Sequence, residues 1–109
     1  MIAWDVWILE ERSLKIFWRA HPEAKRPLLA WLTEVEHARW KSPVDVRARY
    51  RSADFVKDKV IFDIAGNKFR LVVRFAYADP HRKPPLNGIA LILFVGTHKQ
   101  YDEIDVVDL

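Results

Sequence analysis

Five side chains that suit the cleavage of a phosphodiester bond lie in two short runs in the C-terminal half of this chain. The first run, residues 66–73, is a turn followed by alternating cationic and apolar residues. The second, residues 94–102, is an apolar stretch that ends at Gly-Thr and continues with polar residues. Cations stabilise a crowded phosphorane, whereas imidazole and phenol groups move protons. The two runs therefore predict a metal-independent catalytic site made of Asn67, Lys68, Arg70, His98 and Tyr101.

Other common catalytic and cofactor motifs are absent from the sequence. It contains no glycine-rich nucleotide-binding motif, no HExxH zinc motif, and no serine or cysteine in a nucleophile-elbow context. Its four histidines are too scattered to predict a metal cluster, and we expect no cofactor. Taken alone, a histidine such as His98 is more often a cap or a surface residue than a catalyst.

Composition indicates one folded domain spanning residues 1–109. Half of the residues are hydrophobic and 30% are charged, which is typical of a globular protein. No apolar run approaches the roughly 18 residues of a membrane span, and the first residues do not resemble a secretory signal. The absence of cysteine excludes a disulfide framework and a thiolate zinc site. These features favour a cytoplasmic protein without membrane contact.

Positive charge is concentrated in the middle of the chain. Residues 41–83 contain eleven Lys and Arg against five Asp and Glu, whereas residues 84–109 contain one lysine against four acidic residues. Such a segment favours a polyanionic or acidic partner, although a solvated basic face without a partner gives the same pattern. If the partner is RNA, we expect its backbone to be held by Arg47, Arg49, Arg51, Lys57, Lys59, Arg74 and Lys99.

Hydrophobic periodicity predicts an α+β fold. Alternation over residues 3–9 is typical of a first strand, and stripes at helical spacing predict two helices joined by a turn at His21-Pro22. A short helix after Ser42 precedes a meander of strands near residues 54–56, 60–64, 68–77 and 89–95, and a final helix follows Thr97. We expect the N-terminal strand and the helical hairpin on one face of an antiparallel sheet, with basic side chains on the other face.

Three segments of this meander carry expectations about exposure. Alternation over residues 68–77 places Lys68, Arg70, Val72 and Arg74 on one face, the basic face of the sheet. Residues 89–95 are almost wholly apolar, which predicts a strand buried on both faces. The charged residues 57–59 predict an exposed turn, and the proline-rich residues 79–88 predict a polar hairpin loop.

The stretches at residues 50–55, 61–72 and 94–104 together resemble the HigB toxin family of type II toxin–antitoxin modules. Residues 17–18, 21–24, 31 and 40–43 are similar to the helical half of that family, so the likeness covers roughly residues 10–106. The resemblance implies a RelE-like fold and ribosome-dependent cleavage of mRNA. It also implies neutralisation by a helix-turn-helix antitoxin of the HigA type, and RNA-contacting or catalytic roles for Asn67, Lys68, Arg70, His98 and Tyr101.

The chain departs from the family pattern at three places. It has Asp63 where the family has asparagine, Leu93 where the family has arginine, and a longer loop over residues 78–88. The change at Leu93 removes a cation, and the sequence leaves open whether Arg74 on the neighbouring strand replaces it. Two alternatives to a nuclease remain. One is a non-catalytic module that binds RNA or an acidic protein, and the other is a toxin of the same fold that acts on a DNA topoisomerase.

Overall fold

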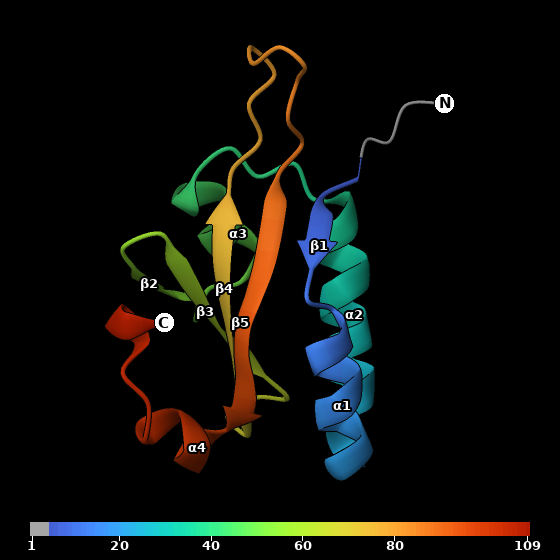
Figure 1. Ribbon diagram of the computed structural model, residues 1–109, viewed down its shortest axis with the longest axis vertical. Helices are drawn as coiled ribbons and strands as arrows, with labels where there is room; N and C mark the ends of the chain where they lie inside the picture. The colour runs from blue at the N-terminus through green and yellow to red at the C-terminus, as the bar shows by residue number, and fades with distance from the viewer. Residues whose placement is uncertain (1–4) are drawn as a thin grey trace.

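The computed structural model describes residues 5–109, which form a five-stranded mixed sheet with helices packed against it (Figure 1). Its strands lie in the order β1-β5-β4-β3-β2, with β1 parallel to β5 and the other pairs antiparallel. The elements are β1 (Trp7–Leu9), α1 (Arg12–Ala20), η1 (Pro22–Ala24), α2 (Lys25–His37), α3 (Pro43–Arg49), β2 (Asp54–Val56), β3 (Lys59–Ile64), β4 (Phe69–Ala76), β5 (Ile89–Thr97), α4 (His98–Asp102) and η2 (Val106–Asp108).

The predicted α+β fold class is confirmed, with one difference in the sheet. The N-terminal strand does not lie over the sheet but extends its edge as a parallel neighbour of β5. The expected start of that strand, at residues 3 and 4, lies outside the described residues. The final helix begins at His98, directly after Thr97, as the sequence predicts.

Helices α1 and α2 form the expected hairpin because their apolar stripes face the hydrophobic core. The Trp31 ring meets Phe62 of β3 edge-on, with centroids 5.4 Å apart, and Phe17 meets Phe69 of β4 in the same way, also at 5.4 Å. The stripes therefore serve the core rather than a ligand site. The buried residues of the two helices are Leu14, Phe17, Leu28, Trp31, Leu32 and Val35.

The opposite face of the sheet is covered by the C-terminal end of the chain. Lys59 of β3 is 3% exposed, and its ammonium group donates to the carbonyl oxygens of Val106 and Val107, both at 2.9 Å. Nη2 of Arg74 on β4 donates to the carbonyl of Leu109 at 3.1 Å. In Figure 1 the red C-terminal segment lies beside β2 and β3. This segment therefore covers part of the face that the sequence leaves open, at Lys59.

Two expectations about exposure are wrong. Lys59 begins strand β3 instead of ending an exposed charged turn, so the cation expected to contact RNA is buried. Arg70 and Val72, expected on a basic face open to solvent, are also buried. Alternation along a strand identifies residues that share a face, but it does not reveal what covers that face.

Strand β5 is more exposed than its apolar sequence predicts. Ile92 is buried, whereas Leu93 and Phe94 are partly exposed. Val72 and Val73 of β4 pair with Phe94 and Ile92, so Leu93 is the extra residue of a β-bulge. The prediction that this strand is buried on both faces is therefore wrong, and the position of the absent family arginine falls at an irregularity of the sheet.

Candidate functional site

Four of the five predicted site residues come together where β5 ends and β4 begins. The backbone N–H of His98 donates to the carbonyl of Lys68 at 3.1 Å, which joins α4 to the turn before β4. The Thr97 hydroxyl accepts from the Gln100 N–H at 3.1 Å, and the Gln100 side chain accepts from the Thr97 N–H at 2.8 Å. This capping box fixes the first turn of α4. The residues brought together are Asn67, Arg70, His98 and Tyr101.

A tight turn between β3 and β4 positions Asn67. Ala65 and Gly66 have φ angles of 55° and 68°, a left-handed conformation that costs glycine little and alanine more. The turn returns the chain so that both the carbonyl and the side-chain oxygen of Asn67 accept hydrogen bonds from Arg70. The fifth predicted residue, Lys68, stands exposed in the same turn.

The guanidinium of Arg70 is the centre of the cluster, and its side chain is only 11% exposed. Nε forms an ion pair with Oδ1 of Asp63 at 3.1 Å. Nη1 donates to the carbonyls of Asn67 and Phe69, each at 3.3 Å. Nη2 donates to the side chain of Asn67 and to Nδ1 of His98, the latter at 2.9 Å. Asp63 and Arg70 pair directly across β3 and β4, so the unusual carboxylate compensates the arginine.

His98 is held on its other side by Asp102, since Nε2 lies 3.3 Å from Oδ2 four residues further along α4. The Tyr101 ring centroid lies 6.0 Å from Cζ of Arg70. Burial raises the pKa of the Tyr101 phenol above its ordinary value, Asp54 adds to the rise, and Arg70 opposes it. Tyr101 is therefore an O–H donor at neutral pH rather than a phenolate.

Two members of the cluster, Asp63 and Asp102, are absent from the site predicted from the sequence. The i, i+4 spacing of His98 and Asp102 on a helix is a signal for their contact. The pairing of Asp63 with Arg70 depends on the register of two strands, which the sequence does not state directly.

The remaining cations expected to contact RNA fall into two groups. Some are already bound: Arg47 donates to a backbone carbonyl at 3.0 Å, Arg49 pairs with Glu34 at 2.5 Å, and Arg74 pairs with Asp58 at 2.9 Å. The others are exposed and make no side-chain hydrogen bond or ion pair with residues 5–109. These cations, which remain accessible to a ligand, are Arg51, Lys57, Lys68 and Lys99.

Arg74 does not replace the cation that is absent at Leu93. It pairs with Leu91 of β5 and lies four residues beyond Arg70 on β4, which is about 13 Å along a strand. Its guanidinium binds Asp58 and the C-terminal Leu109 instead of joining the cluster.

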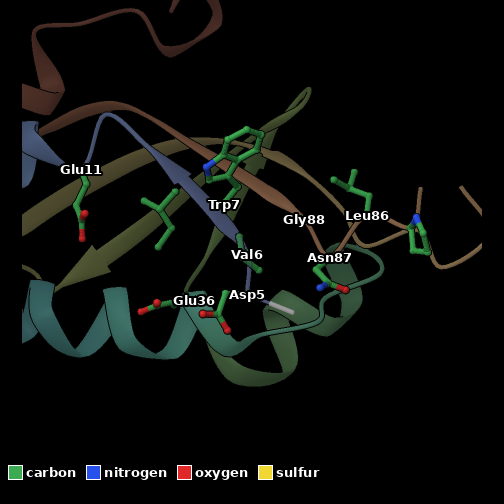
Figure 2. A pocket seen from close by; sticks show the side chains of 10 residues that line it. Asp5, Val6, Trp7, Glu11, Glu36, Leu86, Asn87 and Gly88 are labelled. Atoms are coloured by element: carbon green, nitrogen blue, oxygen red, sulfur yellow. The ribbon is translucent and has the colours of Figure 1, made fainter. Parts of the chain in front are cut away.

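An acidic hollow of about 460 Å³ lies at the far end of β5 from the cluster (Figure 2). Trp7 on its rim is 68% exposed and pairs with Ile89, the first residue of β5, whereas His98 follows the last. Because its charged groups are carboxylates, this hollow does not suit a polyanion. The carboxylates come from Asp5, Glu11 and Glu36.

A second hollow, of about 540 Å³, borders the cluster between α1 and α4. Phe94, which contributes to its wall, lies 6.4 Å from Tyr101 between ring centroids. On the opposite wall the His21 ring stacks on Phe17 at 4.5 Å. The hollow thus offers aromatic surface next to the donors of the cluster.

The described part of the chain contains no group of three or more metal-ligating side chains placed to hold a metal ion. None of the helices within residues 5–109 is long and apolar enough to cross a lipid bilayer.

The fold and the site define a small α+β protein in which a buried arginine lies beside a histidine and a tyrosine, with two exposed lysines nearby, an arrangement suited to phosphate. Residues 24–104 match the HigB toxin family, the RelE-like toxic component of a toxin–antitoxin system. The chain belongs to this family, and membership implies an antitoxin partner. No curated protein sequence matches the chain.

Proposed function

We propose that this protein is a cytoplasmic mRNA endonuclease that acts on the translating ribosome as a single toxin domain, without a metal or cofactor. The observation that carries the proposal is the cluster of Asn67, Arg70, His98 and Tyr101 in a chain of the RelE-like toxin class. The antitoxin is expected to be a helix-turn-helix protein of the HigA type. Its acidic side chains would meet the exposed cations.

RNA carries its own nucleophile, so the protein has to manage protons and charge. O2′ loses its proton and bonds to phosphorus, the P–O5′ bond breaks, and O5′ takes a proton. The products are a 2′,3′-cyclic phosphate and a 5′-hydroxyl. The Tyr101 O–H is the donor for O5′, and the exposed Asp102 carboxylate is the acceptor for the O2′ proton. Lys68 and Lys99 compensate the charge that develops on the phosphate.

The ribosome supplies the alignment that this site lacks. The cluster contains no general acid and general base whose pKa values both lie near neutral pH. The rate therefore depends on how the mRNA is positioned, and an external scaffold has to position it. The exposed Arg51 and Lys57 hold ribosomal RNA through its backbone, which is a salt-sensitive contact.

Expression without antitoxin tests the function directly. The wild-type chain should arrest growth and cut mRNA inside translated regions, while Tyr101→Phe, which removes one O–H, should be much less toxic. Lys15→Ala on α1 is the matched control and should behave as wild type. Growth arrest with intact mRNA would favour the non-catalytic binding module, and arrest with altered DNA supercoiling would favour a topoisomerase target.

Purified protein should cut naked RNA slowly, and EDTA should not change the rate. The reason is that no metal-ligating group serves the cluster within the described residues, and free RNA is not aligned with it. The measurement is the cleavage of one mRNA, free and on programmed ribosomes, with and without chelator. Fast EDTA-sensitive cleavage of the free RNA would contradict the proposed mechanism.

A further inference from the structure

We propose that Arg70 and Asp63 are positioning residues that hold His98 as a neutral imidazole with its proton on Nε2, so that His98 serves as a hydrogen-bond donor to the scissile phosphate and not as its acid or base. The inference deepens the proposed function and rests on it for the identity of the substrate. The tautomer of His98 is independent of that function.

The first step is that Arg70 has no donor left for a phosphate. A guanidinium carries five N–H bonds, and Arg70 meets five acceptor atoms, one at Nε and two at each terminal nitrogen. Its side chain is 11% exposed, so a ligand could reach it only by displacing the protein's own acceptors. The prediction that Arg70 meets the scissile phosphate is therefore replaced by a role inside the protein.

The second step is that Arg70 determines the protonation of His98. Arginine is a donor without acceptor atoms and stays protonated in proteins. Because its Nη2 lies 2.9 Å from Nδ1 of His98, this ring nitrogen has to be the acceptor and carries no proton. An imidazolium would carry a proton on Nδ1 as well, and this N–H would point at the guanidinium. Two positive groups would then be in contact. The neutral ring then carries its proton on Nε2.

The third step is that Nε2–H is a donor on the accessible side of the ring. His98 has 46% of its side chain exposed, and Nε2 faces Asp102, whose side chain is 60% exposed and on the same helix. An oxyanion of the phosphate can take the place of this exposed carboxylate at Nε2–H. A neutral imidazole is too weak an acid to protonate O5′, but it stabilises an oxyanion by hydrogen bonding. Proton transfer is then left to Tyr101 and Asp102.

The fourth step concerns Asp63, which keeps Arg70 in place. The carboxylate is paired with Arg70 across the strands and supplies the only negative charge that contacts the buried guanidinium among residues 5–109. A buried cation that loses its partner is destabilised and moves toward water. Without Asp63, Arg70 would turn away from Nδ1, and His98 would be free to carry its proton on either nitrogen.

Histidine ring ¹⁵N–¹H correlation spectra of the full chain at neutral pH measure the tautomer, and the loss of one signal set in His98→Gln assigns His98. We expect Nδ1 of His98 unprotonated and Nε2 protonated in the wild type. In Asp63→Ala we expect a mixture of tautomers, whereas Asp63→Asn, which keeps an acceptor for Nε–H, should retain most of the wild-type signal. A wild-type spectrum with Nδ1 protonated would overturn the proposal, even if the protein cuts mRNA.

A pair of substitutions at His98 tests the donor role on programmed ribosomes. The amide nitrogen of glutamine can occupy the position of Nε2, whereas that of asparagine is closer to Nδ1. We expect single-turnover cleavage by His98→Gln within about tenfold of wild type, and a loss of about 10²-fold or more in His98→Asn and His98→Ala. Equal losses in all three would show that His98 transfers a proton and would overturn the donor role. If neither the wild type nor any variant cleaves mRNA, the proposed function fails, but the result on the tautomer of His98 stands.

Discussion

A buried arginine is stable only when both its charge and its N–H groups are compensated. Arg70 meets both conditions, because Asp63 balances the charge and four further acceptors surround the guanidinium. The same contacts make Arg70 rigid, since moving it would break several hydrogen bonds at once. Rigidity at this residue is what allows one side chain to orient both Asn67 and His98.

Tyr101 is the residue at which the chemistry is most directly tested. Tyr101→Phe keeps the ring but removes the proton for O5′, so single-turnover cleavage on the ribosome should slow by about 10²-fold. Because burial and Asp54 raise the pKa of the phenol, it remains protonated well into the alkaline range. Between about pH 7 and about pH 9, the cleavage rates of the wild type and of Tyr101→Phe should therefore change with pH in the same way.

The controls for Tyr101→Phe are binding and folding. Ribosome affinity and the unfolding midpoint should stay close to wild type, because the ring contact with Phe94 does not need the hydroxyl. If Tyr101→Phe cleaves at the wild-type rate, the donor for O5′ is another group.

At the scale of elements, the sequence predicts most of the helices and strands but not the contacts between them. The capping box at Thr97 and Gln100 is a local signal, and it places His98 correctly. The Asp63–Arg70 pair depends on strand register, and the bulge at Leu93 inserts a residue that no alternation rule anticipates. Contacts between elements far apart in sequence therefore account for the part of the site that the sequence does not predict.

The C-terminal segment is the clearest such case. Lys59 is a charged residue with charged neighbours, which is typical of a turn. The carbonyls that bind it belong to Val106 and Val107, 47 and 48 residues further along the chain. No local pattern reports a contact at that separation. The segment explains why Lys59 is buried although it is a cation on the second face of the sheet.

Lys59→Met tests whether this contact holds the C-terminal segment. The substitution keeps the length of the side chain but removes the donors for Val106 and Val107, at a cost of about 1 kcal/mol per hydrogen bond. Amide exchange over residues 106–109 should become faster by roughly thirtyfold, while the core strands change little. Lys57→Met, an exposed residue of the preceding turn, is the control. Unchanged exchange in Lys59→Met would show that other contacts hold the segment.

At the scale of the whole molecule, the two ends of β5 carry different exposed charged groups. The hollow beside β1 carries carboxylates, whereas the cluster at the other end of β5 is flanked by the exposed Lys68 and Lys99. The exposed lysines attract a polyanion, whereas the carboxylates of the hollow repel one. The net charge of +3 alone would not reveal this difference.

Arg51 is the best residue for testing contact with ribosomal RNA, because it is exposed and makes no ion pair within the described chain. Arg51→Ala should weaken ribosome binding and reduce the slope of log affinity against log salt by about 0.7–0.9, the value for one phosphate contact. Single-turnover cleavage at saturation should remain nearly unchanged, since Arg51 lies outside the cluster. Arg49→Ala should also weaken binding, but its slope is harder to assign because the substitution releases the Glu34 carboxylate. Lys15→Ala on α1 removes the same charge elsewhere, and an equal change of slope in that control would mean that binding depends on net charge and not on this segment.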